Sequence, residues 1–277
     1  MAIVTVSREL GSLGTEIADT LCSGLGLARL DKESLEGLLT TLGMSSPQFE
    51  RADEKAPGFW EHFSVERVRY LDFMKAAMYR FAAERDCLVV GRGAHLIFRG
   101  VPGVLRLRVV APVKLRVERL QARLGVDQPR ALRILHQSDR DRAGYHRYFF
   151  DAAWDALADY DLVVNTAFVS PAETVETVAA LLRSPSRTGA GHLARAALRD
   201  LSIAQDVILA IAYRERVPVT QLEVTCDKGV VALDGAVRAQ AQADWAQEVA
   251  RGVPGVIRVM SAIAVEQYPY YPGTWIA

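Results

Sequence analysis

A glycine-bearing turn near the start of the chain has residue types that can bind phosphate. A β-branched run over residues 2–6 precedes the turn, and a stretch with apolar side chains three and four residues apart follows it over residues 15–25. This order predicts a strand, a turn and a helix, and the main-chain N–H groups of such a turn can point at phosphate oxygens. The residues of the turn are Gly11, Ser12, Leu13, Gly14 and Thr15. The pattern alone leaves two explanations open, phosphate binding or glycines placed for steric reasons.

Positive charge near this turn would have to come from arginine. The standard phosphate-binding loop has a lysine after its last glycine, whereas this chain has Thr15 followed by Glu16. Arginine suits the task because its planar guanidinium can pair with two phosphate oxygens at once. The candidates are Arg8, Arg92, Arg119, Arg123, Arg140 and Arg142, and Arg8 is our candidate to replace the lysine. The alternative is that these side chains solvate helix faces, with Asp139 and Asp141 as local ion-pair partners.

Strands that alternate with helices must position these residues. We expect strands over residues 2–6, 87–90, 104–110 and 160–166, and helices over residues 15–25, 31–42, 61–85, 112–124, 129–142 and 172–182. This alternation predicts an α/β domain over residues 1–183 with a parallel sheet and helices on both faces. Asp31 precedes a helix that begins at Lys32, so the interpretation that we favour for it is a helix cap.

The pattern of apolar and polar residues changes after a stretch that contains Ser, Pro and Gly. We expect a linker over residues 184–199, a small α+β domain over 200–267 and a tail over 268–277. Within the small domain the pattern predicts helices over residues 203–214 and 240–252, a hairpin of strands 222–226 and 230–233, and a strand over 256–265.

Composition limits the classes of function. The 277 residues carry 33 Lys and Arg against 33 Asp and Glu, so no global charge favours nucleic acid as a partner. Three cysteines are too few and too scattered for a disulfide framework or a zinc site, and the histidines show no metal-ligand spacing, so we assign no metal site to protein side chains. We see no secretory signal and no stretch long enough to span a membrane, so we expect a cytoplasmic protein. The sequence leaves homo-oligomerisation open.

Residues 3–18 resemble the opening of the cytidylate kinase-like family, in which a Ser-Arg-Glu-Phe-Gly-Ser-Gly-Gly-Arg-Glu-Ile pattern replaces the ordinary P-loop. Further segments resemble the family in the same order along residues 1–183: residues 31–33, 53–57, 90–94, 111–112, 139–142 and 160–166, with Tyr145. The resemblance implies a P-loop, nucleoside monophosphate kinase-like fold that takes ATP and Mg²⁺ and transfers phosphate to CMP or another nucleoside monophosphate.

The same resemblance implies roles for individual residues. ATP would lie at Gly11–Thr15 with Arg119 and Arg123, and residues 116–142 would form a mobile lid. Catalytic roles would fall to Arg8, Arg140 and Arg142, and acceptor binding to Asp31, Arg92 and Asp141, with Asp141 near a ribose hydroxyl.

The chain also departs from the family pattern. Cytidylate kinases have carboxylates on both sides of a Gly-Arg pair and use them to recognise the nucleotide, and here Val90 and Gly93 stand at these positions. Gln137 and Gly144 stand where arginines flank the Asp-Arg-Asp-Arg pattern. Two interpretations therefore stay open, an ATP-dependent nucleotide kinase or a catalytically weak nucleotide-binding sensor.

The end of the chain resembles a BON domain over about residues 200–267. The segments that carry the resemblance are residues 206–211, 222–237, 246–256 and 259–265. The resemblance implies an interaction module with a protein or ligand partner, which would regulate or localise the first domain. No residue in it suggests catalysis.

Overall fold

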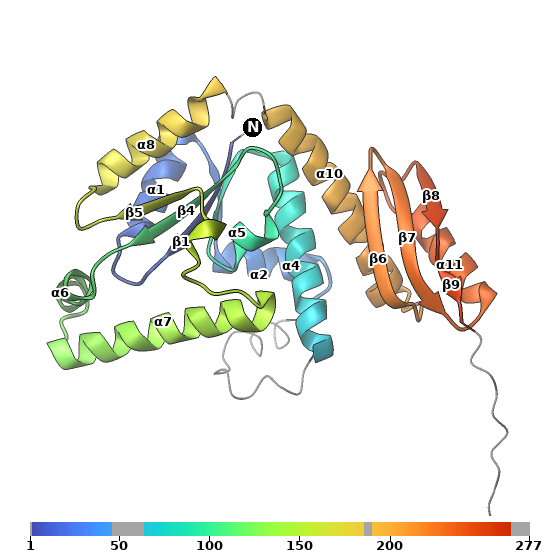
Figure 1. The fold of residues 1–277 in the computed structure, drawn as a ribbon, viewed down its shortest axis with the longest axis horizontal. Coiled ribbons are helices and arrows are strands. Elements are labelled where there is room, and N and C mark those ends of the chain that lie inside the picture. The colour runs from blue at the N-terminus through green and yellow to red at the C-terminus, as the bar shows by residue number, and fades with distance from the viewer. Residues whose placement is uncertain (1, 46–63, 186–189, 267–277) are drawn as a thin grey trace, which may run out of the picture. The chain divides into compact units, whose positions relative to one another are not determined.

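The computed structural model describes residues 2–45, 64–185 and 190–266, and the chain divides into two compact units, Met1–Leu198 and Arg199–Ala277 (Figure 1). The expected acceptor-region segment 53–57, part of the expected linker and the expected tail 268–277 lie outside the described residues. In that described part, no helix has the length and apolar character needed to cross a bilayer.

The first unit is built on a parallel sheet, as predicted, and this sheet has five strands, one more than the four expected. Its order is β2-β3-β1-β4-β5, formed by β2 (Ala28–Leu30), β3 (Cys87–Val90), β1 (Ile3–Arg8), β4 (Val104–Val110) and β5 (Leu162–Asn165). The sequence analysis missed β2, because its three residues are too few to show a strand period. β1 lies in the centre of the sheet, so its carboxyl end has a neighbouring strand on each side.

Helices connect the strands and supply the rest of the core. They are α1 (Gly14–Leu25), α2 (Lys32–Thr41), α4 (Ser64–Glu84), α5 (Ala94–Ile97), α6 (Val113–Leu124), α7 (Gln128–Phe150), the 3₁₀ turn η2 (Leu157–Asp159) and α8 (Pro171–Arg183). One face of the sheet packs on α1 and α8, through residues such as Leu21 and Val178 against Val4, Val6 and Leu107. Successive side chains of a strand point to opposite faces, so Ser7 lies on the other face of β1 from Val6.

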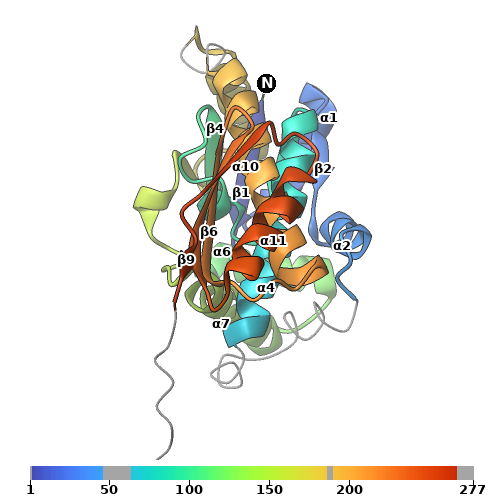
Figure 2. The same cartoon turned by 90° about the vertical axis from the view of Figure 1, so that its right-hand side faces the viewer.

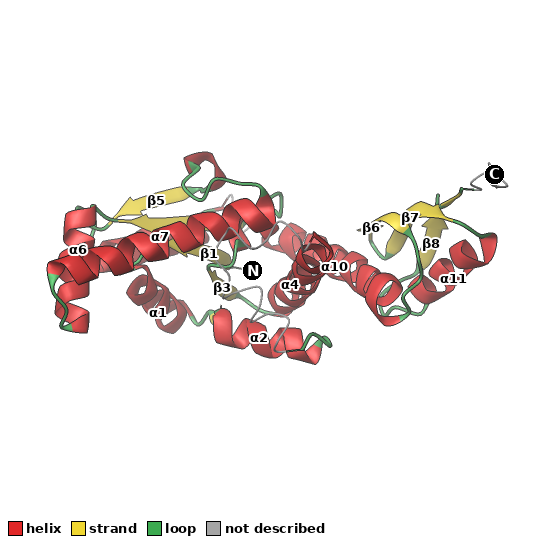
Figure 3. Cartoon of the chain, turned by 90° about the horizontal axis from the view of Figure 1, so that it is seen from below, coloured by secondary structure: helices red, strands yellow, loops and turns green. Residues whose placement is uncertain are grey.

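The helix α7 is longer than the pattern predicted and carries residues of the candidate site at its centre (Figure 3). It begins at an Asp127 cap, whose side chain accepts a hydrogen bond from Arg130 N at 2.9 Å. The sequence analysis expected it to end at Arg142. The helix continues to Phe150 since His146 and Phe149 remain buried at a helical spacing.

The second unit contains a four-stranded sheet with α11 packed on it (Figure 2). Its elements are the last part of α10 (Gly191–Ile208), a helix that begins in the first unit, and then the π-helical turn η3 (Leu209–Arg214), β6 (Thr220–Asp227), β7 (Val230–Val237), α11 (Gln240–Arg251), β8 (Arg258–Ser261) and β9 (Ala264–Val265). β6 pairs with β7 antiparallel, while β8 and β9 both pair with β7 in parallel.

Two secondary-structure predictions for this end of the chain were wrong. The expected strand 256–265 is divided into β8 and β9, although Ala262 N still donates to Leu233 O at 2.8 Å and keeps both strands beside β7. The expected helix 203–214 begins earlier than predicted, because α10 already starts at Gly191, within the expected linker 184–199.

The core of the first unit gives a direct test of the fold. We expect Leu107→Ala to lower the free energy of unfolding by about 2–5 kcal/mol, because Leu107 is fully buried between α1, α8 and the sheet and its truncation leaves a cavity. The matched control is Leu157→Ala, since Leu157 is 63% exposed and its truncation removes little packing. Equilibrium urea unfolding followed by circular dichroism measures the difference. Equal losses for the two variants would contradict the packing described above.

Candidate phosphate-binding site

The carboxyl ends of β1 and β3 bring two of the predicted arginines to the same edge of the sheet. Val6 is opposite Val90 in the parallel register, and Gly91 N donates to Val6 O at 2.9 Å. Arg8 ends β1, and Arg92 follows β3 by two residues. In open α/β sheets ligands bind in the crevice outside the carboxyl ends of the strands, so both residues lie where a ligand is expected.

The side chain of Arg8 passes over one glycine and ends beside another. A Cβ atom on Gly14 would lie 2.4 Å from Arg8 Cβ, and a Cβ atom on Gly91 would lie 2.3 Å from Arg8 Nη1. Both positions therefore need glycine for this close approach. The Arg8 side chain thus extends from Gly14, next to the phosphate turn, to Gly91 in the β3–α5 turn.

Arg8 carries a positive charge that no neighbouring carboxylate neutralises directly. Among the described residues it forms no ion pair, and its buried Nε has no hydrogen-bond partner. Burial, with the charges of Arg142, Arg29 and Arg92, lowers the pKa of Arg8 to about 10, while Asp31 acts in the opposite direction. Excess positive charge in a low-dielectric site favours an anion.

Arg142 and Arg92 complete the cluster of three arginines. Arg142 Nη1 donates to Arg8 O, and its guanidinium carbon lies 5.8 Å from the centroid of the Trp154 ring. Burial lowers the pKa of Arg142, as does the charge of Arg116, and Asp139 opposes them. Arg92 has a left-handed backbone, φ 53°, and lies 5.7 Å from the centroid of the Tyr145 ring. The structure thus brings together Arg8, Arg92 and Arg142.

The glycine turn leads into α1 with its amide groups uncapped. Gly11 and Leu13 have left-handed backbones, φ 78° and 63°, and Leu13 makes no side-chain cap for the helix. The first N–H groups of a helix have no partner inside it. At the start of α1 they include those of Gly14, which is buried, and Thr15, which is exposed.

The other predicted site residues lie elsewhere on α6 and α7. Arg119 donates from Nη1 to Gly11 O at 3.1 Å and to Thr166 Oγ1 at 2.9 Å, so it lies behind the turn. Arg123 is exposed in the last turn of α6 and has no recorded partner among the described residues.

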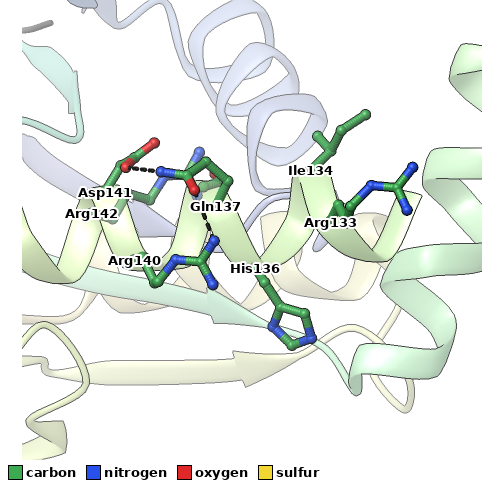
Figure 4. A pocket seen from close by; sticks show the side chains of 8 residues that line it. Arg133, Ile134, His136, Gln137, Arg140, Asp141 and Arg142 are labelled. Atoms are coloured by element: carbon green, nitrogen blue, oxygen red, sulfur yellow. Dashed lines mark hydrogen bonds between the residues drawn. The ribbon is translucent and has the colours of Figure 1, made fainter. Parts of the chain in front are cut away.

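Arg140 and Asp141 lie on an exposed side of α7 and share Gln137 as a partner. Gln137 Nε2 donates to Asp141 Oδ1 at 2.7 Å, and Arg140 Nη2 donates to Gln137 Oε1 at 2.8 Å (Figure 4). With these residues an open pocket of about 750 Å³ is lined by Arg133, Ile134, His136, Ser138 and Arg142. Among the hydrogen bonds of the described residues, none joins Arg140 or Asp141 to Arg8, Arg92 or Arg142.

Asp31 is the helix cap that the sequence favoured. Its side chain accepts from Ser34 N at 3.2 Å and from Ser34 Oγ at 2.6 Å, and it forms an ion pair with Arg29 Nε at 3.0 Å. Burial alone would raise the pKa of Asp31, but the hydrogen bonds from Ser34 and the charge of Arg29 lower it overall. Its charge also reaches Arg8, so Asp31 lies at the margin of the arginine cluster.

A buried polar network next to Arg8 was missed by the sequence analysis. Trp154 Nε1 and Tyr160 OH both donate to Ser7 Oγ at 3.2 Å, and Arg108 Nη1 donates to Trp154 O at 2.9 Å. The only sequence signals were a serine directly before Arg8 and an arginine inside an apolar strand. This network fixes the end of β1 from which the Arg8 side chain extends.

Two buried histidines, to which we assigned no role, pack against the same network. The His95 ring stacks on Tyr160 at 4.5 Å and on His146 at 5.3 Å between centroids. His146 Nδ1 donates to Arg142 O at 2.8 Å, which ties the histidine to the helix turn that carries Arg142.

The family comparison agrees with this fold. The strand–glycine turn–helix arrangement and the arginines around it define a P-loop kinase-like protein, and residues 3–167 match the Cytidylate kinase-like family. The chain belongs to the cytidylate kinase-like family. Residues 199–267 match the BON domain, as predicted. No curated protein matches the chain.

The chain is similar to several solved structures. An uncharacterized protein from Eubacterium ventriosum superimposes with a TM-score of 0.51 at 19% identity, covering 66% of this chain and 99% of that one. A sugar kinase from Janibacter sp. has a TM-score of 0.41 at 18% identity, covering 66% and 94%, and a shikimate kinase from Bacteroides thetaiotaomicron has 0.39 at 11%, covering 66% and 99%. The likeness to the first of these shows the fold.

The contact between Gly14 and Arg8 predicts a clear difference between two glycines of α1. We expect Gly14→Ala to destabilise the protein by about 1–3 kcal/mol, because the new methyl group displaces the Arg8 side chain. Gly24→Ala is the matched control: no atom lies within 4 Å of its Cβ position, so alanine should stabilise the helix by about 0.5–1 kcal/mol. Thermal unfolding of both variants measures these changes. Stabilisation by both substitutions would show that Arg8 does not lie against Gly14.

The buried histidines predict an acid-sensitive fold. Burial lowers the pKa of His95 from 6.5 to about 3 and that of His146 from 6.5 to about 4, so the unfolded chain binds more protons than the folded one between these values and 6.5. Stability is therefore complete above pH 6.5 and falls as the pH decreases, by up to about 1.4 kcal/mol per pH unit for each histidine. Urea unfolding at a series of pH values measures the slope. His146→Gln should make it shallower, whereas a change of the exposed His136 to Gln should leave it unchanged.

Proposed function

We propose that the first unit binds the phosphates of ATP at Gly11–Thr15 and transfers the terminal phosphoryl group to a phosphate-bearing acceptor such as a nucleoside monophosphate. The observation that carries the proposal is the arginine cluster at the carboxyl ends of β1 and β3. In this cluster Arg8 is half-buried, forms no ion pair with a carboxylate of the described residues and lies between two glycines that leave space for it. Burying a charge without a partner costs free energy, and an anion that binds beside Arg8 in the working protein would offset this cost.

The positions of the groups fit phosphoryl transfer. This reaction needs little covalent chemistry from the protein and depends on positioning and on charge around the transferred group. The uncapped amides at Gly14 and Thr15 would hold the donor phosphates. Arg8 reaches from there to Gly91, so its guanidinium would lie between donor and acceptor. Arg142, bonded to Arg8 O, would stabilise the negative charge that develops between them.

The protein side chains do not offer a complete magnesium site. Within the described ranges, no group of three or more His, Cys, Asp and Glu residues is arranged to hold a metal ion. Magnesium usually keeps several waters and binds mainly through substrate phosphates in kinases. The ion would thus arrive with ATP, and its chemistry would be to neutralise phosphate charge.

The acceptor need not be cytidylate. Gly93 stands where cytidylate kinases have a carboxylate, and a Cβ atom there would lie 2.1 Å from Cε2 of Phe150. The Phe150 ring thus occupies the space that a side chain at position 93 would need. An aromatic ring accepts a nucleobase by stacking and does not read its hydrogen-bonding edge, so we expect weak discrimination among nucleobases at this point.

The second candidate function is a nucleotide-binding sensor with weak or no turnover. Thr15 in place of the P-loop lysine favours it, because the loss of one phosphate-binding charge can cost about 10³–10⁵ in rate. The second unit would then pass the signal to a protein or ligand partner. Its sheet and helix leave apolar side chains exposed, with Ile257 at 80% and Met260 at 50%.

Substitution of Arg8 tests the proposal. We expect Arg8→Gln to lower the rate of ADP formation by about 10³-fold or more, in a coupled assay with ATP, Mg²⁺ and a panel of nucleoside monophosphates. Arg85→Gln is the control, since Arg85 is exposed just before β3, at the opposite edge of the sheet. ATP binding without turnover on any acceptor would leave the sensor function. Full activity of Arg8→Gln would overturn the role proposed for the arginine cluster.

A further inference from the structure

Five consecutive carbonyl oxygens of the segment 8–12 accept hydrogen bonds from behind the phosphate turn. Arg142 binds Arg8 O, Ser12 Oγ binds Glu9 O at 2.8 Å, Arg116 Nε binds Leu10 O at 2.7 Å, Arg119 Nη1 binds Gly11 O at 3.1 Å and Thr166 Oγ1 binds Ser12 O at 3.0 Å. Four of these five donors come from α6, α7 and the end of β5. Side chains from elements distant in the sequence thus fix the phosphate turn through its carbonyl oxygens.

This bonding sets the direction of the amides. In a trans peptide the C=O of one residue and the N–H of the next point in opposite directions. Because Leu10 O and Ser12 O point toward Arg116 and Thr166, the N–H groups of the residues after them point to the other side of the turn. Within the ranges that the structure describes, no hydrogen bond from the N–H groups of Gly11, Leu13, Gly14, Thr15 or Glu16 is recorded. The turn is therefore arranged to present amides to an anion before one binds.

Arg116 and Arg119 differ in how their charge is balanced. Arg116 is buried between two carboxylates, with Nη1 at 3.3 Å from Glu9 Oε2 and Nη2 at 2.7 Å from Asp139 Oδ1. Arg119 is half-buried and forms no ion pair in the part of the chain that the structure describes. Its three hydrogen bonds go to Gly11 O, Thr166 Oγ1 and Thr166 O, the last at 2.9 Å.

We propose that Arg119 is the positioning residue of the phosphate turn. This inference rests on the proposed function. Arg119 acts from behind, through Gly11 and Thr166, and does not need to touch the nucleotide. Its planar guanidinium donates hydrogen bonds both to the turn and to the residue after β5. This fixes the position of the turn relative to β5, so that the amides of the turn stay directed at the phosphates.

The test compares binding of two probes, ATP and inorganic tripolyphosphate, by isothermal titration to the full chain. Tripolyphosphate has no base or ribose, so it reports the phosphate turn alone. We expect Arg119→Gln to weaken binding of both probes at least tenfold, and Arg119→Lys to restore part of the loss by keeping the charge without the fork. The matched control is Lys114→Gln, which removes an exposed positive charge from the first turn of α6 and should bind both probes as the wild type does.

A second variant separates positioning from direct contact. Thr166 is buried, so Thr166→Val cannot remove a contact to the nucleotide, yet it removes the bonds to Ser12 O and Arg119 Nη1. Positioning predicts a threefold to tenfold loss of tripolyphosphate affinity, measured on variants whose circular dichroism matches that of the wild type. Wild-type affinity of both Thr166→Val and Arg119→Gln would overturn this inference alone. A wild-type chain that binds neither probe would overturn the proposed function and this inference with it.

Discussion

The close approach of Arg8 to the chain determines most of the candidate site. Its side chain passes Gly14 and ends beside Gly91, so two glycines and the end of a central strand are committed to one guanidinium. Holding this charge costs free energy because it is half-buried beside Arg142 and Arg92, and burial lowers its pKa to about 10. Hydrogen bonds on both sides of Arg8 hold it in place despite this cost. Trp154 and Tyr160 donate to Ser7 Oγ, and Arg142 donates to the backbone oxygen of Arg8. A strained electrostatic arrangement on a rigid support is typical of functional sites.

Much of the fold could be predicted from local patterns. The β-branched run before Gly11 indicated β1, and the spacing of Ile17, Leu21 and Leu25 indicated α1, because both elements bury one side against the same core. The cap at Asp31 was also readable, since an aspartate directly before a helix has a local reason to be there. Predictions succeeded where the cause lay within a few residues of the position concerned.

The parts that could not be predicted depend on contacts between distant residues. Arg119 and Arg140 look alike in the sequence, but Arg119 contacts Gly11, 108 residues away, and Arg140 contacts Gln137 on its own helix. The extension of α7 to Phe150 depends on the burial of His146 and Phe149 against other elements, which no local propensity reports. The division of strand 256–265 depends on the register with β7. Which arginine belongs to the site is thus a property of the fold.

The packing of Phe150 on Gly93 has a consequence for relatives of this chain. The two residues compete for one volume, because a Cβ atom at position 93 and the Phe150 ring cannot both be present at 2.1 Å. A relative that carries aspartate at the equivalent of Gly93 must therefore have a smaller residue, or a differently placed helix end, at the equivalent of Phe150. The residues at the two positions should change together when homologues are aligned. The pair would then separate members that hydrogen-bond the edge of a nucleobase through an aspartate from members that stack a nucleobase on an aromatic ring.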